Sequence, residues 1–328
     1  MIDAAIVGLG RWGRKLVEAV QGRSARLRFV RGAVRHPEAA REFAARHGFA
    51  LSCDLAEVLA DPRVQAVVLA TPHSAHVEQV VAAAAAGKAV FCEKPLALDR
   101  AGAERAVEAC RRAGVALGVG QDKRFWPSMR ELARVVESGD LGEILHLEGN
   151  SSNEVARRHF SPWRAAPQES PGGSMTATGI HVLDAFVRLA GAVRRVYARH
   201  YPRRDPPQLL DTVAVLLEHE CGASGLLSSV RTTPFFWRVH VFGERGSAEA
   251  VGENELVLRR CGEPPRRLCF AREDALRLEL EAFADAVEGR APYPVSPSQM
   301  IEVVAALEAI CRSMETGAPV ALGARLAA

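Results

Sequence analysis

Short apolar runs alternate with longer stretches of helical spacing along the first 120 residues. The apolar runs predict buried strands and lie at residues 4–7, 27–34, 65–70, 89–92 and 115–120. Between them, apolar residues recur three or four apart, which predicts one helix directly after residue 13 and others at residues 37–48, 77–86 and 101–114. Strands that alternate with helices at this pitch indicate an α/β fold with a doubly wound parallel sheet.

The period of the pattern changes in the second half of the chain. Beyond Gly191, apolar and polar residues alternate, which predicts half-buried strands at residues 196–201, 211–219, 225–231, 236–243 and 255–260. Helical spacing predicts helices at residues 127–139, 174–190, 276–289 and 298–317. We therefore expect a second, α+β domain with a large, open and mainly antiparallel sheet. Open apolar sheet faces usually find partners, so we expect a homodimer or homotetramer through this sheet.

Length and composition agree with two ordinary globular domains. The chain has 328 residues, 48% of them hydrophobic and 25% charged, and its character changes at residues 120–127. We place the domains at residues 1–122 and 123–328. A net charge of +3 and apolar runs shorter than the ~18 residues of a membrane span indicate neither a nucleic-acid nor a membrane partner. Seven cysteines without a CxxC pair indicate reduced thiols in a cytoplasmic protein.

The first predicted strand runs into the sequence GLGRWG, residues 8–13, and then into a helix. In this context each glycine has its own role. Gly8 permits a tight turn, Gly10 lets the backbone approach a pyrophosphate, and Gly13 lets the helix pack on the strand. The phosphates would sit on free N–H groups at the start of the helix, beside Arg11 and Trp12. The motif predicts a Rossmann-type dinucleotide-binding domain.

The end of the second predicted strand bears on the choice of coenzyme. About twenty residues after the glycines, NAD-binding domains carry a carboxylate that holds the adenosine ribose. Here the chain has Val34, Arg35 and His36, and the nearest acid, Glu38, already lies in the next helix. A guanidinium matches a 2′-phosphate, so Arg35 favours NADP over NAD. The alternative is that Arg35 is one surface arginine among many.

Two further strand ends carry candidate chemistry. Ligands of doubly wound sheets bind at the carboxyl ends of the strands, where this chain places Thr71, Pro72, Glu93 and Lys94. Lysine occurs at only four positions, and 38 of the 42 basic residues are arginine, which cannot release its proton at working pH. Lys94 could hold a substrate hydroxyl and move its proton as a hydride is transferred. The alternative is a salt bridge with a neighbouring carboxylate.

His73 and His76 form an HxxH pair at the entry to the helix at residues 77–86. No third metal ligand is adjacent, and the pair lacks the glutamate of an HExxH motif. We therefore expect no metal, and interpret His76 as a histidine that caps the helix or contacts the coenzyme.

The helix predicted at residues 174–190 carries the other candidates. Ser174 is the expected N-cap, and Thr178, His181 and Asp184 follow along one polar stripe. His181 is a candidate acid/base with Asp184 one turn away. The alternative is a structural histidine.

Three other side chains are candidate substrate contacts. Lys123 stands at the domain junction, and Trp163 and Arg164 belong to the loop that precedes the helix at residues 174–190. Trp163 and Arg164 could stack on or hydrogen-bond a sugar, or only fix the loop.

Four motifs carry a resemblance to the glucose-fructose oxidoreductase/inositol dehydrogenase/rhizopine-catabolism (Gfo/Idh/MocA) family. They are GLGRWG at 8–13, ATPHSAH at 70–76, CEKPLAL at 92–98 and GGSMTATGIHVLD at 172–184. The resemblance spans nearly the whole chain. It implies a nucleotide-binding domain joined to a domain built on an open sheet, NAD(P)-dependent oxidation of sugars, cyclitols or related polyols, and assembly as dimers or tetramers.

The resemblance also implies roles for particular residues. The glycines match the nucleotide loop, Thr71 and Pro72 match the nicotinamide side, Lys94 matches the EKP lysine, and His181 matches the histidine that commonly acts as acid/base. One departure stands out. Members with a complete catalytic set often carry an aspartate four residues before that histidine, and this chain has Ala177.

Three functions follow from this reading. The first is an oxidoreductase that exchanges a hydride with a secondary alcohol or ketone, with Lys94 and His181 handling the proton and Asp184 or a substrate carboxylate supplying the missing charge. The second, motivated by Ala177, is a ligand sensor that binds coenzyme without turnover. The third, motivated by the range of the family, is a glycosidase that keeps its nicotinamide bound.

Overall fold

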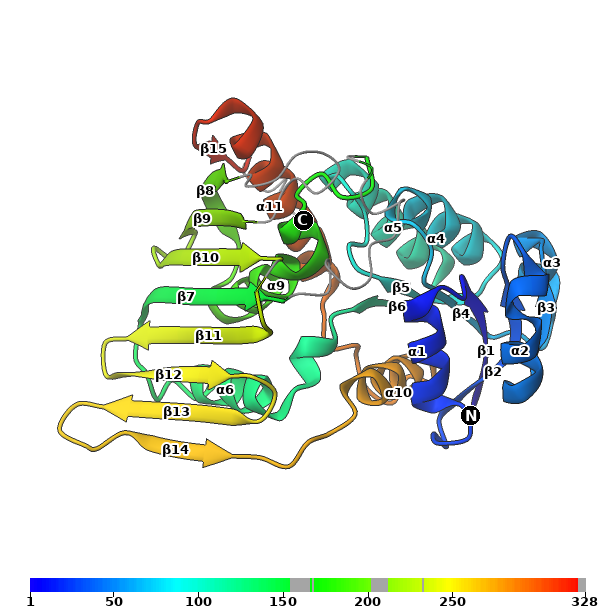
Figure 1. The fold of residues 1–328 in the computed structure, drawn as a ribbon, viewed down its shortest axis with the longest axis horizontal. Helices are drawn as coiled ribbons and strands as arrows, with labels where there is room; N and C mark the ends of the chain where they lie inside the picture. The colour runs from blue at the N-terminus through cyan, green and yellow to red at the C-terminus, as the bar shows by residue number, and fades with distance from the viewer. Residues whose placement is uncertain (154–165, 167, 202–211, 232, 324–328) are drawn as a thin grey trace. The chain divides into compact units, whose positions relative to one another are not determined.

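A computed structural model describes residues 1–153, 166, 168–201, 212–231 and 233–323. The chain divides into two compact units (Figure 1). The first comprises Met1–Asp122 and a later segment, Asp274–Ile301; the second comprises Lys123–Glu273 and the chain from Glu302 onward.

The first unit is built on a parallel six-stranded sheet with the order β3-β2-β1-β4-β5-β6. Its strands are β1 (Ile2–Val7), β2 (Leu27–Ala33), β3 (Ala50–Ser52), β4 (Ala66–Leu69), β5 (Ala89–Glu93) and β6 (Leu117–Gly120). Every residue of β4 and β5 is buried, as expected for strands covered on both faces. The predicted α/β fold with a doubly wound parallel sheet is therefore confirmed.

Helices cover both faces of this sheet. They are α1 (Arg11–Val20), α2 (Arg41–His47), α3 (Leu55–Ala60), α4 (His76–Ala85), α5 (Arg100–Ala113) and α10 (Ala275–Val287). Figure 1 shows α1 and α10 packed together on one face and α4 and α5 packed together on the other. The strand order reverses between β1 and β4, and ligands of doubly wound sheets bind at that point.

The second unit is built on a nine-stranded sheet with the order β14-β13-β12-β11-β7-β10-β9-β8-β15. Its strands are β7 (Ile144–Ser152), β8 (Val193–His200), β9 (Thr212–His219), β10 (Ser224–Val230), β11 (Phe236–Gly243), β12 (Gly246–Val251), β13 (Glu255–Arg260), β14 (Arg266–Cys269) and β15 (Val320–Ala321). Among the described strands of this sheet, only β7 and β10 pair in parallel (Figure 1), so the expectation of a mainly antiparallel sheet is confirmed.

One face of this sheet is covered by α6 (Pro127–Glu137) and α9 (Ile180–Ala190). Helix α11 (Pro297–Thr316) begins in the part of the chain assigned to the first unit and ends in the second, where Ser313 Oγ accepts a bond from the Ala198 N–H on β8. The helix predicted from residue 174 begins differently. A single π-helical turn, Met175–Gly179, precedes α9, and Ser174 makes no side-chain cap. Ser174 thus occupies the predicted N-cap position, but its buried hydroxyl donates to the Ser229 carbonyl at 3.3 Å instead of accepting a cap hydrogen bond.

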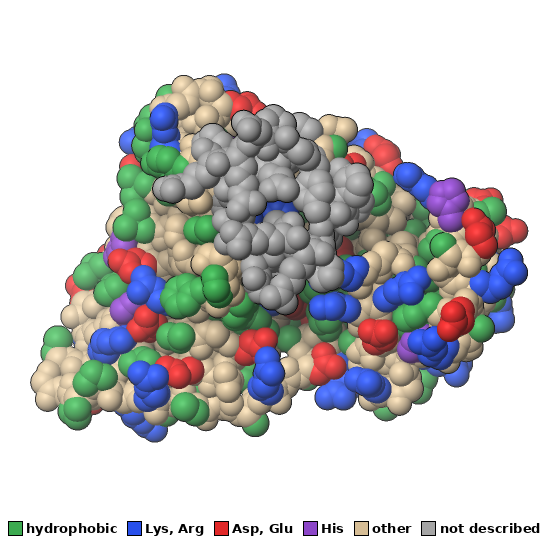
Figure 2. Space-filling model, viewed as in Figure 1, with side chains coloured by type: hydrophobic (Ala, Val, Ile, Leu, Met, Phe, Trp, Pro, Cys, Tyr) green, Lys and Arg blue, Asp and Glu red, His purple; other side chains and the backbone are tan. Residues whose placement is uncertain are grey.

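The surface carries charges of both signs. Figure 2 shows Lys and Arg side chains interspersed with Asp and Glu over the described part of this face. No helix among the described residues is both long and apolar enough to cross a membrane. All seven cysteines lie in the described part of the chain, and each is a free thiol.

Candidate active site

The loop after β1 has the geometry that a dinucleotide requires. Gly8 has φ of +92°, and a Cβ there would lie 2.6 Å from the Ala70 carbonyl oxygen. A Cβ on Gly13 would lie 2.0 Å from the Gly8 carbonyl oxygen, because α1 packs directly on the strand. A Cβ on Gly10, by contrast, would meet nothing within 4 Å. The space beside Gly10 is where the backbone would approach a pyrophosphate, so these residues fit the group.

The first turn of helix α1 has no acidic side chain of its own. Gly10 is the N-cap, and no side chain caps it. The first turn instead carries Arg11, which is exposed, and Trp12, which is half-buried. Free N–H groups and the helix dipole favour an anion at this position.

The end of β2 is open to solvent. Arg35 and His36 are exposed, and Glu38 lies with its carboxylate 3.7 Å from the His36 ring. Arg35 is the first charged side chain after the end of this strand, two residues beyond Ala33.

Trp12 and Glu93 connect the glycine loop to the end of β5. The Trp12 indole N–H donates to Glu93 Oε1 at 2.6 Å, and the Lys94 N–H lies 3.3 Å from Oε2. The carboxylate lies against Gly120 of the neighbouring strand, where a Cβ would come within 2.7 Å of Oε1. Glu93 is 7% exposed, so its carboxyl group at this strand end is largely shielded from solvent.

Burial raises the pKa of Glu93 to about 7 from its ordinary 4.5. The charge of Asp122 raises it further, while the charge of Lys94 and the hydrogen bond from Trp12 oppose the rise. Burial disfavours the charged carboxylate because low-dielectric surroundings solvate it poorly. The carboxyl group beside Lys94 therefore has its pKa raised toward neutral pH.

Glu93 should make stability depend on pH. Since its folded pKa lies above the unfolded value, its stabilising contribution is complete below about pH 4.5 and is lost as the pH rises through 7. We expect the free energy of unfolding of wild type to fall, relative to Glu93→Gln, by about 3 kcal/mol across this range. Urea unfolding of both full-length chains at several pH values measures this. Glu42→Gln, at an exposed carboxylate, is the control, and parallel wild-type and E93Q profiles would contradict the expectation.

Thr71 and Lys94 lie at the ends of β4 and β5, which pair in parallel. Both side chains are half-buried. The Thr71 hydroxyl donates to Gln79 Oε1 at 2.6 Å, and His76 is fully buried against the main chain of both strand ends. Of the residues predicted for the coenzyme, the structure therefore brings Thr71, His76 and the Lys94 segment together.

In the second unit, Asp184 forms a buried ion pair with Arg124. Arg124 donates from Nε to Oδ2 at 2.7 Å and from Nη2 to Oδ1 at 2.8 Å, and both side chains are at most 3% exposed. Both carboxylate oxygens of Asp184 thus accept from one guanidinium. His181, one turn earlier on α9, is 8% exposed.

The surroundings of His181 carry an excess of positive charge. A recess beside it is lined by Lys123, Arg124 and Arg188 as well as Asp184. Burial, and then the charge of Arg124, lower the pKa of Arg188. The ammonium group of Lys123 lies 3.9 Å from the centre of the Trp126 ring, a cation–π distance.

The remaining candidate site residues lie in the π-helical turn or outside the described residues. Thr178 lies in the π-helical turn, and its hydroxyl donates to the Ser174 carbonyl at 3.2 Å. Ala177 is half-buried in the same turn. Single π turns occur frequently at functional sites. Trp163 and Arg164 lie outside the described residues.

Sequence reasoning missed two features of these sites. The partner of Asp184 is Arg124, sixty residues earlier, and nothing in the local pattern indicates that pairing. The bond from Trp12 to Glu93 spans 81 residues. One signal for this bond is present in the sequence: when the indole of a tryptophan such as Trp12 packs into a protein, its N–H usually finds a hydrogen-bond partner.

Comparisons with known proteins agree with this geometry. Residues 2–121 match the model of an oxidoreductase family with an NAD-binding Rossmann fold, and residues 129–249 match the Gfo/Idh/MocA C-terminal domain. The chain is 29% identical to scyllo-inositol 2-dehydrogenase (NAD(+)) of Bacillus subtilis, covering 99% of this chain and 98% of the relative. It is 31% identical to myo-inositol 2-dehydrogenase of Thermotoga maritima, covering 73% and 74%.

Solved structures share the fold. A levoglucosan dehydrogenase in complex with NADH and levoglucosan has a TM-score of 0.88 at 22% identity, covering 98% of this chain and 99% of the other. The WlbA dehydrogenase of Bordetella pertussis, in complex with NADH and UDP-GlcNAcA, has a TM-score of 0.87 at 24% identity, covering 99% and 98%.

Proposed function

The chain belongs to the Gfo/Idh/MocA family of NAD-binding oxidoreductases, and from that premise we propose that it exchanges a hydride with a secondary alcohol or ketone of a sugar, cyclitol or related polyol. The bound nicotinamide supplies the hydride chemistry. The observation that carries the proposal is the position of Lys94 at the end of β5, with its segment fastened to the Thr71 strand end beside the glycine loop.

In this proposal Lys94 holds the substrate hydroxyl and takes or returns its proton as the hydride moves. His181 is the second acid/base. Asp184 has both oxygens bonded to Arg124, so we assign it the positioning of α9 and of His181 rather than proton transfer. The charge that Ala177 does not provide would then come from a carboxylate of the substrate.

A panel assay tests the proposed reaction. Purified protein is incubated with NAD or NADP and a series of inositols, aldoses, ketoses and sugar acids, and nicotinamide absorbance is followed. Mass spectrometry of small molecules that copurify guides the choice of substrates. Turnover of at least one polyol or sugar is the expected result. Tight coenzyme binding without turnover of any compound would favour the sensor that Ala177 suggests, and release of free sugar without net reduction would favour the glycosidase.

We further propose that NADP is the preferred coenzyme, because Arg35 is exposed near the end of β2 and no carboxylate occupies the ribose position. Arg35→Asp should lower the affinity for NADPH relative to NADH by about tenfold or more, the usual effect of losing a charge-assisted bond. Fluorescence titration with each coenzyme measures the ratio. Arg23→Asp, at an exposed arginine beyond the far end of α1, is the control, and an unchanged ratio in R35D would remove the 2′-phosphate contact.

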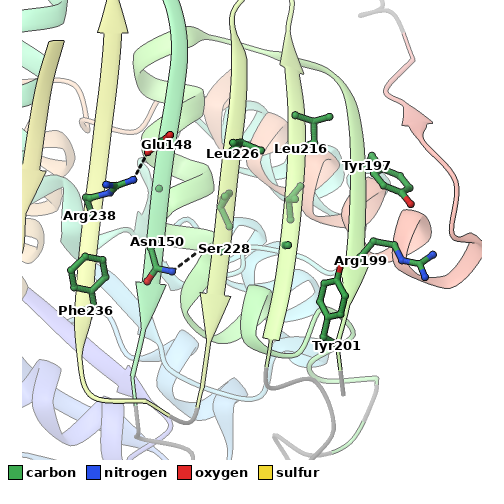
Figure 3. A pocket seen from close by; sticks show the side chains of 14 residues that line it. Glu148, Asn150, Tyr197, Arg199, Tyr201, Leu216, Leu226, Ser228, Phe236 and Arg238 are labelled. Atoms are coloured by element: carbon green, nitrogen blue, oxygen red, sulfur yellow. Dashed lines mark hydrogen bonds and ion pairs between the residues drawn. The ribbon is translucent and has the colours of Figure 1, made fainter. Parts of the chain in front are cut away.

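The face of the nine-stranded sheet that α6 and α9 leave uncovered supports self-association. Figure 3 shows Leu226, Leu216 and Tyr197 in a row on neighbouring strands, and Phe236 on β11, beyond the Asn150–Ser228 and Glu148–Arg238 pairs. The four apolar and aromatic side chains are 36–48% exposed. Aromatic and aliphatic side chains on an open face are typical of interface centres. We propose that a second copy of this chain covers it.

Light scattering in solution tests the oligomer. Wild type should be a dimer or tetramer, and Leu226→Asp should dissociate it. Leu145→Asp, at an equally exposed leucine on the opposite face of the sheet, should not. A monomeric wild type would exclude the interface.

Free thiols at all seven cysteines support a cytoplasmic location.

A further inference from the structure

His76 lies between two strand ends of the first unit. It is the first residue of α4, the helix that follows β4, and its ring is 0% exposed. Nδ1 lies 2.7 Å from the Pro95 carbonyl oxygen, and Nε2 lies 3.1 Å from the Thr71 carbonyl oxygen. One side chain therefore spans from the segment after β4 to the segment after β5.

The ring can donate to either segment, and to both at once only as the imidazolium, because a neutral imidazole carries a single N–H. A carbonyl oxygen can only accept a hydrogen bond, so each contact is a bond when the ring nitrogen carries a hydrogen. The shorter of the two contacts is made to Pro95, which directly follows Lys94 in the chain. The rings of His73 and His76 make an edge-to-face contact, with 5.7 Å between the ring centres.

A second side chain of α4 fastens Thr71. Gln79 follows His76 by three residues, which places the two side chains on one face of the helix. Its Oε1 accepts from the Thr71 hydroxyl at 2.6 Å. Thr71 is thus held at its carbonyl and at its side chain by one turn of α4, while Pro95 is held by His76.

We propose that His76 is a positioning residue that sets the separation between the Thr71 and Lys94 segments. With both ring nitrogens directed at main-chain carbonyls, it would act on the coenzyme through these segments. A displacement of about 1 Å in such a segment can slow a reaction by about a hundredfold. The inference rests on the proposed function of Lys94, but its first consequence is for coenzyme binding, in which proton transfer has no part.

The test uses full-length His76→Phe and His76→Gln, with His219→Phe as the control. His219 is a buried histidine of the second unit whose Nδ1 lies 3.0 Å from the Gly191 carbonyl. We expect H76F to weaken binding of NADPH and NADH by about tenfold, because the Thr71 and Pro95 segments lose the side chain that contacts both of them. H76Q should recover to within about threefold, because its amide N–H can donate to one segment, and H219F should bind like wild type.

Hydrogen exchange adds a local readout. H76F should speed amide exchange at residues 70, 71, 93, 94 and 96 and leave the second unit unchanged. Wild-type affinity and exchange in a folded H76F would overturn the proposal. If H76F does not fold, H76Q decides: moderately weakened binding with faster exchange confined to these residues supports the proposal, and wild-type values for both overturn it. A polyol panel without turnover would contradict the proposed function and leave this result intact.

Discussion

Lys94→Met is expected to lower turnover by about a hundredfold or more while the affinity for coenzyme changes by less than about threefold. A positioned acid/base commonly contributes a factor of about 10² to 10⁴, and methionine keeps much of the length of lysine without its proton. The glycine loop and Arg35, which would hold the coenzyme, are untouched. Steady-state kinetics on a substrate from the panel and coenzyme titration separate the two effects.

Lys88→Met is the matched control for this variant. Lys88 belongs to the same unit, and its ammonium group donates to the carbonyls of Asp61 at 3.0 Å and Val64 at 2.7 Å. Its loss should lower stability and leave turnover within about threefold, because a mutation away from the site acts on the folded fraction. A K94M enzyme with the wild-type rate would remove Lys94 from the mechanism.

Arg124→Met is expected to destabilise the protein by about 3–5 kcal/mol, the usual cost of leaving one partner of a buried ion pair alone. Asp184 would remain with its side chain 2% exposed and without the guanidinium that both oxygens now accept from. Asp184→Leu should also destabilise the protein, since the buried Arg124 guanidinium would lose both of its bonds to this carboxylate. Urea unfolding of both full-length variants measures the losses.

The double variant Arg124→Met/Asp184→Leu shows whether the two residues stabilise the protein through their ion pair or independently of each other. Replacing a buried pair by apolar side chains of similar size is often nearly neutral, so the double variant should recover most of the lost stability. Its turnover, compared with wild type, then reports how far the pair orients His181. Additive losses in the double variant would show that the two residues do not depend on each other.

The first unit could be anticipated from sequence because its signals are local. A buried strand, a glycine loop and a helix follow one another within the first 20 residues, and apolar runs as short as those of β4 and β5 occur where both sheet faces are covered. The separate tasks expected of Gly8, Gly10 and Gly13 agree with the different space available at each.

The second unit was harder to predict from sequence, because packing between its elements overrides the alternation of apolar and polar residues. Strand β7 was not anticipated, although it is central to the sheet. Gly149 and Ser151 face α9 where apolar residues would mark a strand, and a Cβ on Gly149 would lie 2.2 Å from the Val182 side chain. The close approach of the helix therefore removes the alternation by which β7 would be recognised.

The site shows the same division between local and distant signals. Lys94 and Thr71 stand at strand ends that the pattern locates. The partners of Asp184, Glu93 and Thr71 come from other elements, and only packing determines them. The absence of a carboxylate at Ala177 is visible in the sequence, whereas the buried carboxyl of Glu93 beside Lys94 is visible only in the fold.

A crystal structure of the full-length protein with NADPH or NADH tests the central claim most directly. The account predicts the pyrophosphate on the N–H groups beside Gly10, and the nicotinamide ring against Thr71 with the Lys94 amino group facing its reactive carbon. An empty loop at saturating coenzyme, or a Lys94 amino group turned away from the ring into solvent, would contradict it.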